Sequence, residues 1–335
     1  MLLNMNVEEI AAELSSEKDP APLFAEADRV RRQHMGEEVH LRGLIEFSNV
    51  CAKHCLYCGI RASNARLKRY RLSKEEIMAC AAKAKDLDYP TVVLQSGEDP
   101  FFSPQLLAEI VSSIKERLGL AVTLSVGEFS RGDYRLLRSA GADRFLLRFE
   151  TSDRKLFSVL KPDSDYDQRF NCLRNLRDAG FQVGSGIMVG LPGQSMESIA
   201  RDIVIFRELE LDMVGIGPFI PNPDTPIGGV EGGTALLALK TVALTRLATL
   251  NTHIPATTAL GSIDPEGRQK ALRCGANVLM PNISPRKVRA HYSLYPGKIC
   301  VGEEPEQCSG CVDAMLAGLG RTRATHEGHS LRRLA

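Results

Sequence analysis

Three cysteines, Cys51, Cys55 and Cys58, stand in one short stretch of the chain. Thiolates at intervals of four and three residues can bind three irons of one cubane iron–sulfur cluster, which takes four cysteines when its ligand set is complete. No fourth cysteine is nearby, so one iron keeps an open position, and an open position on a bound metal is typical of sites that do chemistry. We therefore predict a [4Fe-4S] cluster with one open iron. A zinc site is the alternative, with His54 as an added ligand.

A second cysteine group lies near the end of the chain, at Cys300, Cys308 and Cys311. The glycines and the proline around these residues are typical of a metal-binding loop, and a zinc knuckle or unpaired thiols are the alternatives. The three remaining cysteines are isolated in the sequence, and we expect them to be buried and inert: Cys80, Cys172 and Cys274.

The composition excludes several classes of function. The 42 basic and 41 acidic residues leave no basic excess for nucleic-acid binding. No apolar run reaches the roughly 18–20 residues of a membrane span. The segment Met1–Leu14 is acidic and predicts an amphipathic helix rather than a secretion signal. We expect a cytoplasmic protein, in which nine cysteines favour metal binding or catalysis over disulfides.

Short apolar runs alternate with longer amphipathic stretches from residue 41 onward, which predicts parallel strands separated by helices. The expected strands are Leu44–Ser48, Thr91–Gln95, Val122–Val126, Arg144–Glu150, Val183–Val189, Met213–Phe219, Pro255–Leu260 and Asn277–Met280. The expected helices are Lys74–Leu87, Pro104–Leu118, Asp133–Ser139, Gln168–Ala179, Ser195–Glu208, Leu236–Leu250 and Pro265–Cys274. Eight alternations predict an α/β fold of the (β/α)8 TIM-barrel type, with a doubly wound open sheet as the alternative.

This pattern divides the chain into three parts. We expect a helical N-terminal extension over residues 1–40, the barrel over 41–285, and an irregular C-terminal extension over 286–335 that carries the second cysteine group. Ala324–Ala335 is expected to lack fixed structure. The first cysteine group follows the first strand, which places it at the C-terminal face, where barrel active sites are built.

The motif Cys-x3-Cys-x2-Cys after a first barrel strand, with the aromatic Tyr57 before the last cysteine, resembles the signature of radical S-adenosylmethionine (SAM) enzymes. The resemblance implies that the amino and carboxylate groups of SAM chelate the open iron. It also implies that an electron from the reduced cluster cleaves SAM to methionine and a 5′-deoxyadenosyl radical, in a dry and enclosed barrel.

The resemblance extends to other strand ends. Gln95-Ser96-Gly97-Glu98 is similar to the glycine-rich motif after the second strand, and Glu150 and Arg169 match residues that hold the SAM amino and carboxylate groups. The expected cofactor-binding residues are Tyr57, Gln95, Gly97, Glu98, Ser125, Glu150, Arg169, Met188, Met280 and Tyr295.

Within the superfamily the chain resembles the branch that contains biotin synthase, methylornithine synthase and the HydE-type maturases of iron–iron hydrogenase. The similar stretches lie at residues 42–49, 70–73, 93–99 and 217–221, and the HydE type is the most similar. That type acts on a small iron complex bearing cysteine, carbon monoxide and cyanide, and the deoxyadenosyl radical adds to its cysteine sulfur. For such an anion we expect Arg148, Thr257 and Thr258 to bind substrate, with Arg148 also counted as catalytic.

The same resemblance implies an auxiliary iron–sulfur cluster, [2Fe-2S] or [4Fe-4S], on Cys300, Cys308 and Cys311. It also implies a reductant such as a ferredoxin or flavodoxin, and other hydrogenase maturases as partners. Three alternatives stay open: a methylornithine synthase-like lysine mutase, a radical SAM relative acting on another small molecule, and a non-catalytic iron–sulfur carrier.

Overall fold

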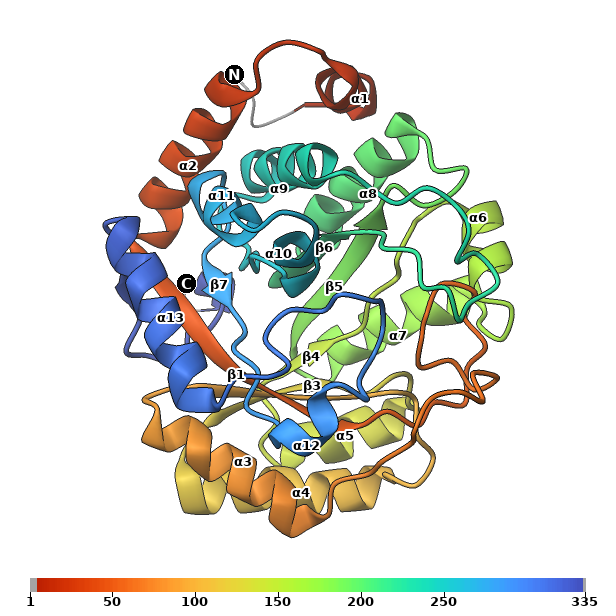
Figure 1. Ribbon diagram of the computed structural model, residues 1–335, viewed down its shortest axis with the longest axis vertical. Coiled ribbons are helices and arrows are strands. Elements are labelled where there is room, and N and C mark those ends of the chain that lie inside the picture. Colours follow the sequence, from red (N-terminus) through yellow and green to blue (C-terminus); the bar gives the residue numbers. More distant parts are fainter. Residues whose placement is uncertain (1–4, 334–335) are drawn as a thin grey trace.

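A computed structural model describes residues 5–333 of the protein. Parallel strands occupy the centre and helices surround them (Figure 1). The strands are β1 (Glu38–Ser48), β2 (Thr91–Ser96), β3 (Ala121–Ser125), β4 (Arg144–Leu146), β5 (Gln182–Val189), β6 (Met213–Pro218), β7 (Val278–Leu279) and β8 (Thr322–Arg323). The long helices are α1 (Val7–Ser15), α2 (Ala21–Met35), α3 (Lys74–Asp86), α4 (Pro104–Leu118), α5 (Arg131–Ser139), α7 (Tyr166–Asp178), α8 (Met196–Glu208), α9 (Ala235–Thr249) and α13 (Pro305–Gly318). Shorter helical segments are α6 (Arg154–Leu160), α10 (Thr258–Ile263), α11 (Gly267–Arg273), α12 (Arg286–Arg289) and the 3-10 turn η1 (Leu331–Arg333).

The strands form a closed parallel ring, as the (β/α)8 prediction requires. Hydrogen-bonded neighbours run in the order β6-β5-β4-β3-β2-β1-β7. The gap between β6 and β7 is bridged by the segment at residues 253–255, because His253 pairs with Met213 and Pro255 pairs with Val278. The short strand β8 pairs with the start of β1.

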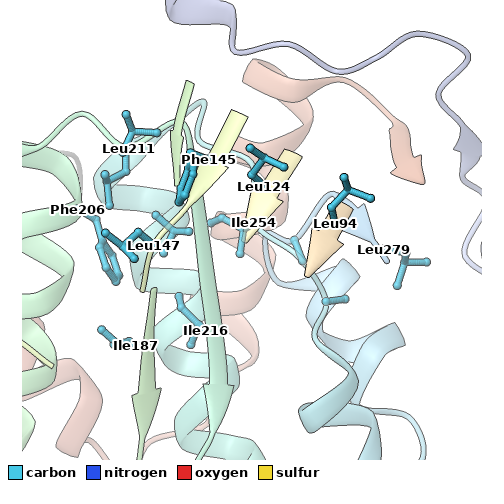
Figure 2. Close-up of a cluster of buried hydrophobic side chains, with 14 of the residues drawn as sticks. Leu94, Leu124, Phe145, Leu147, Ile187, Phe206, Leu211, Ile216, Ile254 and Leu279 are labelled. Carbon is cyan, nitrogen blue, oxygen red and sulfur yellow. The ribbon is translucent and has the colours of Figure 1, made fainter. Parts of the chain in front are cut away.

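Alternate residues of each strand face the inside and the outside of the ring. On β2 and β3 the outward residues Leu94 and Leu124 are fully buried beneath the helices, and Figure 2 shows Leu124 between Leu94 and Phe145 of β4. The inward residues of the same strands, Gln95 and Ser125 among them, line a central cavity. The hydrophobic core therefore lies between strands and helices, and the inside of the ring is free to hold a site.

Serine side chains begin several of these helices as expected. Ser73 accepts a hydrogen bond from the Glu76 amide and closes a capping box at α3, and Ser195 accepts one from the Ser198 amide at α8. At the other end, Gly119 adopts a left-handed conformation (φ 71°) and terminates α4. These local signals set the start of α3 and α8 and the end of α4.

Three expectations about elements are wrong. The seventh strand, predicted over Pro255–Leu260, is reduced to isolated bridges, and α10 begins at Thr258 because the Thr257 side chain caps it. The C-terminal part is not irregular, since α13 spans fourteen residues of it. The end of the chain is ordered through Arg333: Ala324 and Ser330 are buried, while residues 334–335 lie outside the described part.

The segment after β7 crosses the mouth of the barrel. In Figure 1 the blue chain that follows α12 runs in front of the ends of the strands. It is tied to the cysteine loop, since the Gly59 amide donates to the Leu294 carbonyl at 2.9 Å and Asn49 Nδ2 donates to the His291 carbonyl at 2.6 Å. The barrel therefore has a cover over the face that carries the cysteines.

Candidate active site

A cavity of about 330 Å³ runs through the inside of the barrel. The three cysteines of the first group lie on its wall, together with Arg148 and every residue that was predicted to bind the cofactor. The predicted residues that line it are Cys51, Cys55, Cys58, Tyr57, Gln95, Gly97, Glu98, Ser125, Arg148, Glu150, Arg169, Met188, Thr257, Met280 and Tyr295. Thr258 is not among the lining residues, since it is the first residue of α10.

Arg69 holds the cysteine loop through hydrogen bonds to its backbone carbonyls. The Arg69 guanidinium donates to the backbone carbonyls of Asn49 at 2.6 Å and Ile60 at 2.8 Å, on either side of the cysteines. A further bond from Arg69 reaches the Arg61 carbonyl at 2.5 Å. Several charge-assisted bonds from one rigid fork hold carbonyls that a loop would otherwise leave unsatisfied.

Gly97 lets the loop after β2 pack directly against the cysteine loop. A Cβ at this position would lie 2.3 Å from the Val50 carbonyl oxygen and 2.7 Å from Cys51 Cβ. The next residue continues the contact, because the Ala52 amide donates to the Glu98 carbonyl at 2.9 Å. The glycine of the predicted motif is thus required by the packing of backbone on backbone.

The three cysteines present thiols to a shared space. Backbone amides are directed at the sulfurs: the Lys53 amide lies 3.4 Å from Cys51 Sγ. Burial raises the pKa of the Cys51 and Cys58 thiols, so an uncharged state is favoured until a metal replaces the proton. Among residues 5–333 no three His, Cys, Asp or Glu side chains gather closely enough to hold a single ion. Three thiols spread around a cavity, with amide donors behind them, fit a multi-iron cluster.

A row of charged side chains lies beside the cysteine loop, with the buried Arg169 at its centre. Arg169 Nε is 2.8 Å from Glu128 Oε1, and Arg169 Nη2 is 3.4 Å from Glu98 Oε1. Glu98 also lies 3.9 Å from Lys53 Nζ. The Arg169 side chain is 3% exposed. It is therefore not a solvent-facing residue of its helix, although its sequence context alone would allow that. An arginine fixed at this depth is placed to bind a carboxylate.

Glu150 lies beyond the end of β4, where it pairs with Ile187 in an isolated bridge, and it is held in a strained conformation. Its φ is +69°, in the left-handed region that a residue with a Cβ seldom occupies. Two backbone bonds keep it there: the Glu150 amide donates to Gly186 at 3.0 Å, and the Met188 amide donates to Glu150 at 3.2 Å. Strain that the surroundings impose on a cavity residue is typical of functional sites.

Arg148 lies next to this glutamate. Its Nη2 is 3.1 Å from Glu150 Oε2 and donates to the Ile187 carbonyl at 2.5 Å. Its Nε is buried and has no hydrogen-bond partner among the described residues. The Arg148 guanidinium is therefore held through Nη2, and its Nε–H remains free to donate a hydrogen bond to a bound molecule.

Comparison with known proteins agrees with this geometry. Residues 45–204 match the family model described as the radical SAM superfamily. The [FeFe] hydrogenase maturase subunit HydE of Thermotoga maritima is 52% identical over 299 residues, which span 89% of this chain and 86% of the relative. The chain belongs to the radical SAM superfamily. It is an enzyme of that superfamily, and its similarity to HydE extends over most of both chains.

Other relatives belong to the branch that the sequence indicated. The 3-methylornithine synthase of Methanosarcina acetivorans is 31% identical over 83% of this chain and 80% of the relative. A crystal structure of methylornithine synthase covers 96% of both chains with a TM-score of 0.84 at 26% identity. The superfamily implies a four-iron cluster and SAM, and the thiols and the cavity described above fit both.

Several polar residues of this radical SAM cavity were missed by the sequence reasoning. At its base, the buried atoms Arg42 Nε, Thr123 Oγ1 and His253 Nε2 have no hydrogen-bond partner among the described residues. Near the cysteine loop, Lys161 also lines the wall. The inward parity of Arg42 on β1 and Thr123 on β3 was available from strand alternation, whereas the position of Lys161 follows a short helix that was not predicted.

The second cysteine group lies away from this cavity. Cys308 is buried and Cys311 is exposed on α13, and Cys300 has a φ of +62°. A hydrogen bond from Cys308, with Arg268 nearby, lowers the pKa of Cys300 to about 6. A thiol of this kind is largely ionised at neutral pH, which is the state that binds metal. The isolated cysteines Cys80, Cys172 and Cys274 are buried, as expected.

The described part of the chain, residues 5–333, has no helix that is both long and apolar enough to span a membrane.

Proposed function

We propose that this radical SAM enzyme acts in assembly of the iron–iron hydrogenase cofactor, on a small iron complex that carries cysteine, carbon monoxide and cyanide. The observation that carries the proposal is the 52% identity to a HydE maturase over 89% of this chain and 86% of the relative. The match spans 299 residues and is therefore not limited to the segment that carries the cysteines.

The charges of the cavity support an anionic substrate. Four cations line it, and two carboxylates oppose them. The cations are Arg42, Arg148, Lys161 and Arg169, and the carboxylates are Glu98 and Glu150. An iron complex with cyanide ligands is an anion, so the excess of cations over carboxylates in the cavity would favour its binding. A lysine substrate would instead bring an ammonium group that needs carboxylates as partners.

Residues of this chain have separate roles in the proposal. The cluster, when bound, supplies the electron that cleaves SAM to methionine and the 5′-deoxyadenosyl radical. Glu150 accepts hydrogen bonds from the SAM amino group and Arg169 binds its carboxylate. Arg148 directs its free Nε at the anionic substrate, while Thr257 adds a hydroxyl. The cover over the mouth, with Tyr295 facing inward, excludes water from the radical.

The proposal includes the remaining expectations about cofactors and partners. Cys300, Cys308 and Cys311 bind an auxiliary cluster, [2Fe-2S] or [4Fe-4S], away from the reaction. A ferredoxin or flavodoxin supplies the electron, and other hydrogenase maturases are the partners. We place the reaction in the cytoplasm, where thiols remain reduced, because all nine cysteines are free.

The test is an anaerobic assay of the reconstituted enzyme with dithionite and SAM, given either the iron–cysteine complex or lysine. We expect 5′-deoxyadenosine to form, and an adenosylated product to appear only with the iron complex. Arg148→Met is expected to retain slow, uncoupled SAM cleavage and to lose product formation by at least about a hundredfold, the scale of one lost charge-assisted contact of about 3 kcal/mol. Arg148→Lys, which keeps the charge, is the matched control.

Two outcomes would count against the proposal. A rearranged lysine product would assign the enzyme to the methylornithine synthase type. An intact cluster without any 5′-deoxyadenosine would make the protein an iron–sulfur carrier.

A further inference from the structure

Lys161 is a buried cation without a charged partner. The residue is 6% exposed and its side chain reaches the wall of the central cavity. Within residues 5–333 its Nζ makes no hydrogen bond or ion pair, and its one recorded contact is with the Phe157 ring, 5.6 Å from the centroid. Because burying an uncompensated charge costs several kcal/mol, such an ammonium indicates that a negative group belongs beside it.

The backbone fixes Lys161 beside the middle cysteine. Leu56, which follows Cys55, donates from its amide to the carbonyl of Leu160, which precedes Lys161, at 2.8 Å. The same two segments are joined again at Asp163, whose carboxylate accepts from the His54 amide at 2.7 Å and whose carbonyl accepts from Lys53 Nζ at 2.8 Å. The turn after α6 and the cysteine loop therefore form one rigid unit.

Burial lowers the pKa of Lys161, and the Arg169 guanidinium lowers it further. The groups that attract its ammonium and act in the opposite direction are the Cys55 sulfur first, and then the carboxylates of Glu150 and Glu98. Both carboxylates already have cations: Glu150 lies 3.1 Å from Arg148, and Glu98 lies 3.4 Å from Arg169. Cys55 lines the same cavity as Lys161, and its sulfur has no hydrogen bond among residues 5–333.

We propose that Lys161 is a positioning residue for electron transfer, which faces the Cys55 corner of the cluster and stabilises its reduced state. The inference rests on the proposed function only in placing a cluster on Cys51, Cys55 and Cys58. On reduction the cluster takes one electron from an external one-electron donor, no bond forms or breaks, and the net charge becomes one unit more negative. A fixed positive charge at short range favours the more negative state and so raises the reduction potential.

The experiment is a redox titration of the reconstituted, SAM-free enzyme, with dithionite as reductant and the paramagnetic reduced cluster measured by electron paramagnetic resonance. Lys161→Met is expected to lower the ratio of reduced to oxidised cluster about tenfold at the midpoint potential of the parent, which for one electron corresponds to about 59 mV. Lys161→Arg, which keeps the charge, should stay within about twofold. Lys155→Met removes an exposed lysine from α6, the helix that precedes Lys161, and should leave the ratio unchanged.

Iron content is measured first, so that only variants with a full cluster are compared. Lys161→Gln is carried in parallel in case the methionine variant takes up less iron. An unchanged midpoint potential in both neutral variants would overturn the inference. If SAM binding were weakened at the same time, the result would show that the Lys161 ammonium pairs with the SAM carboxylate instead of the cluster. A reaction with lysine instead of the iron complex would sink the proposed function and leave this inference intact.

Discussion

Glu150 is a cavity residue that is held against its conformational preference. A left-handed φ of +69° costs a residue with a Cβ about 1 kcal/mol or more, and glycine would avoid that cost. The chain nevertheless has a glutamate there, with its carboxylate in the cavity and 3.1 Å from Arg148. The conformation places the carboxylate where a strand of regular geometry would not.

Two substitutions separate the side chain from the strain. Glu150→Ala and Glu150→Gly both remove the carboxylate, and both are expected to lose SAM cleavage. Only the glycine variant relieves the positive φ, so its free energy of unfolding should exceed that of the alanine variant by about 1 kcal/mol in urea denaturation of the metal-free protein. Equal stabilities would show that the backbone relaxes when the carboxylate is lost.

The positions of the cysteines, Glu150 and Arg169 around one cavity could be predicted because their motifs are local. The spacing alone groups Cys51, Cys55 and Cys58. The places of Glu150 and Arg169 follow from a strand end and from a helix. Lys161 and His253 could not be predicted in the same way. They meet the site only because the ring closes, and nothing in their own neighbourhood in the sequence indicates a cavity.

At the scale of elements, the loop after β2 and the cysteine loop act as one packed layer. Gly97→Ala would place a Cβ 2.3 Å from the Val50 carbonyl oxygen and 2.7 Å from Cys51 Cβ, and backbone atoms cannot move aside cheaply. The cysteine loop must then shift, and we expect the variant to bind less than about half of the parent's iron on reconstitution, because a sub-ångström misplacement is enough to spoil a metal site.

The matched control for this prediction is Gly132→Ala. Gly132 lies within α5, and its nearest neighbour to a new Cβ is Ser130 Oγ at 3.7 Å. The same added methyl group should leave iron content unchanged and stabilise the helix by about 0.5–1 kcal/mol. A full iron complement in Gly97→Ala would mean that the two loops are not packed as tightly as described.

Helix α8 holds the turn that follows Glu150. Asp202 of this helix is fully buried and accepts a hydrogen bond from the Ser152 amide at 2.6 Å. Burial raises the pKa of Asp202 to about 7, whereas the unfolded chain has an ordinary carboxyl with a pKa of about 4. Between these values the folded protein binds a proton that the unfolded chain has lost, so the free energy of unfolding falls as pH rises from about 4 to 7.

Asp202→Asn removes the titrating group and keeps an oxygen to accept from Ser152. We expect its free energy of unfolding, measured by urea denaturation at a series of pH values, to fall less between pH 4 and 7 than that of the parent. Above pH 7 the two curves should run parallel, since the parent's carboxyl is ionised in both states. Identical slopes below pH 7 would show that Asp202 remains ionised in the fold.

The elements themselves were predictable in proportion to their local signals. Helix α4 matches its predicted range, Pro104–Leu118, because Ser103 caps it and Gly119 ends it. The seventh strand failed because the Thr257 side chain caps a helix in the middle of the apolar run. Helix α13 was missed although Pro305 stands at its first turn and Glu304 and Gln307 form a capping box, signals that the cysteine spacing obscured.

At the scale of the whole molecule, the C-terminal tail closes the base of the barrel. Arg144 is fully buried at the start of β4, and its Nη2 donates to the Glu327 carbonyl at 2.6 Å. Arg42 Nη2 lies 3.4 Å from the Gly328 carbonyl on the same tail. Neither arginine has an ion pair with a carboxylate among residues 5–333, and backbone carbonyls near the end of the chain bind their guanidinium groups instead.

The tail also binds the barrel through neutral groups. The Ser330 amide donates to Gln182 Oε1 at 2.8 Å, and Thr91 Oγ1 donates to the Glu327 carbonyl at 3.0 Å. These bonds reach β2 and β5, which are not neighbours in the ring. The last residues of the chain thus cross-link opposite parts of the barrel, a role that their polar composition concealed.

A chain ending at Arg323 should therefore be less stable than one ending at Arg333, which keeps every contact named above. Removing residues 324–333 deprives two buried arginines of carbonyl partners, and a hydrogen bond to a charged group is worth about 1.5–3 kcal/mol, so the two lost bonds amount to about 3–6 kcal/mol in urea denaturation. Water entering the opened base would hydrate the arginines and offset part of this loss, while leaving the inside of the barrel wet.

The shorter chain should then retain its cysteine loop and its iron but form less product for each SAM cleaved, because a radical generated in a wet cavity is quenched before it reaches substrate. Equal stability and equal coupling in the two chains would show that the barrel is closed without its tail.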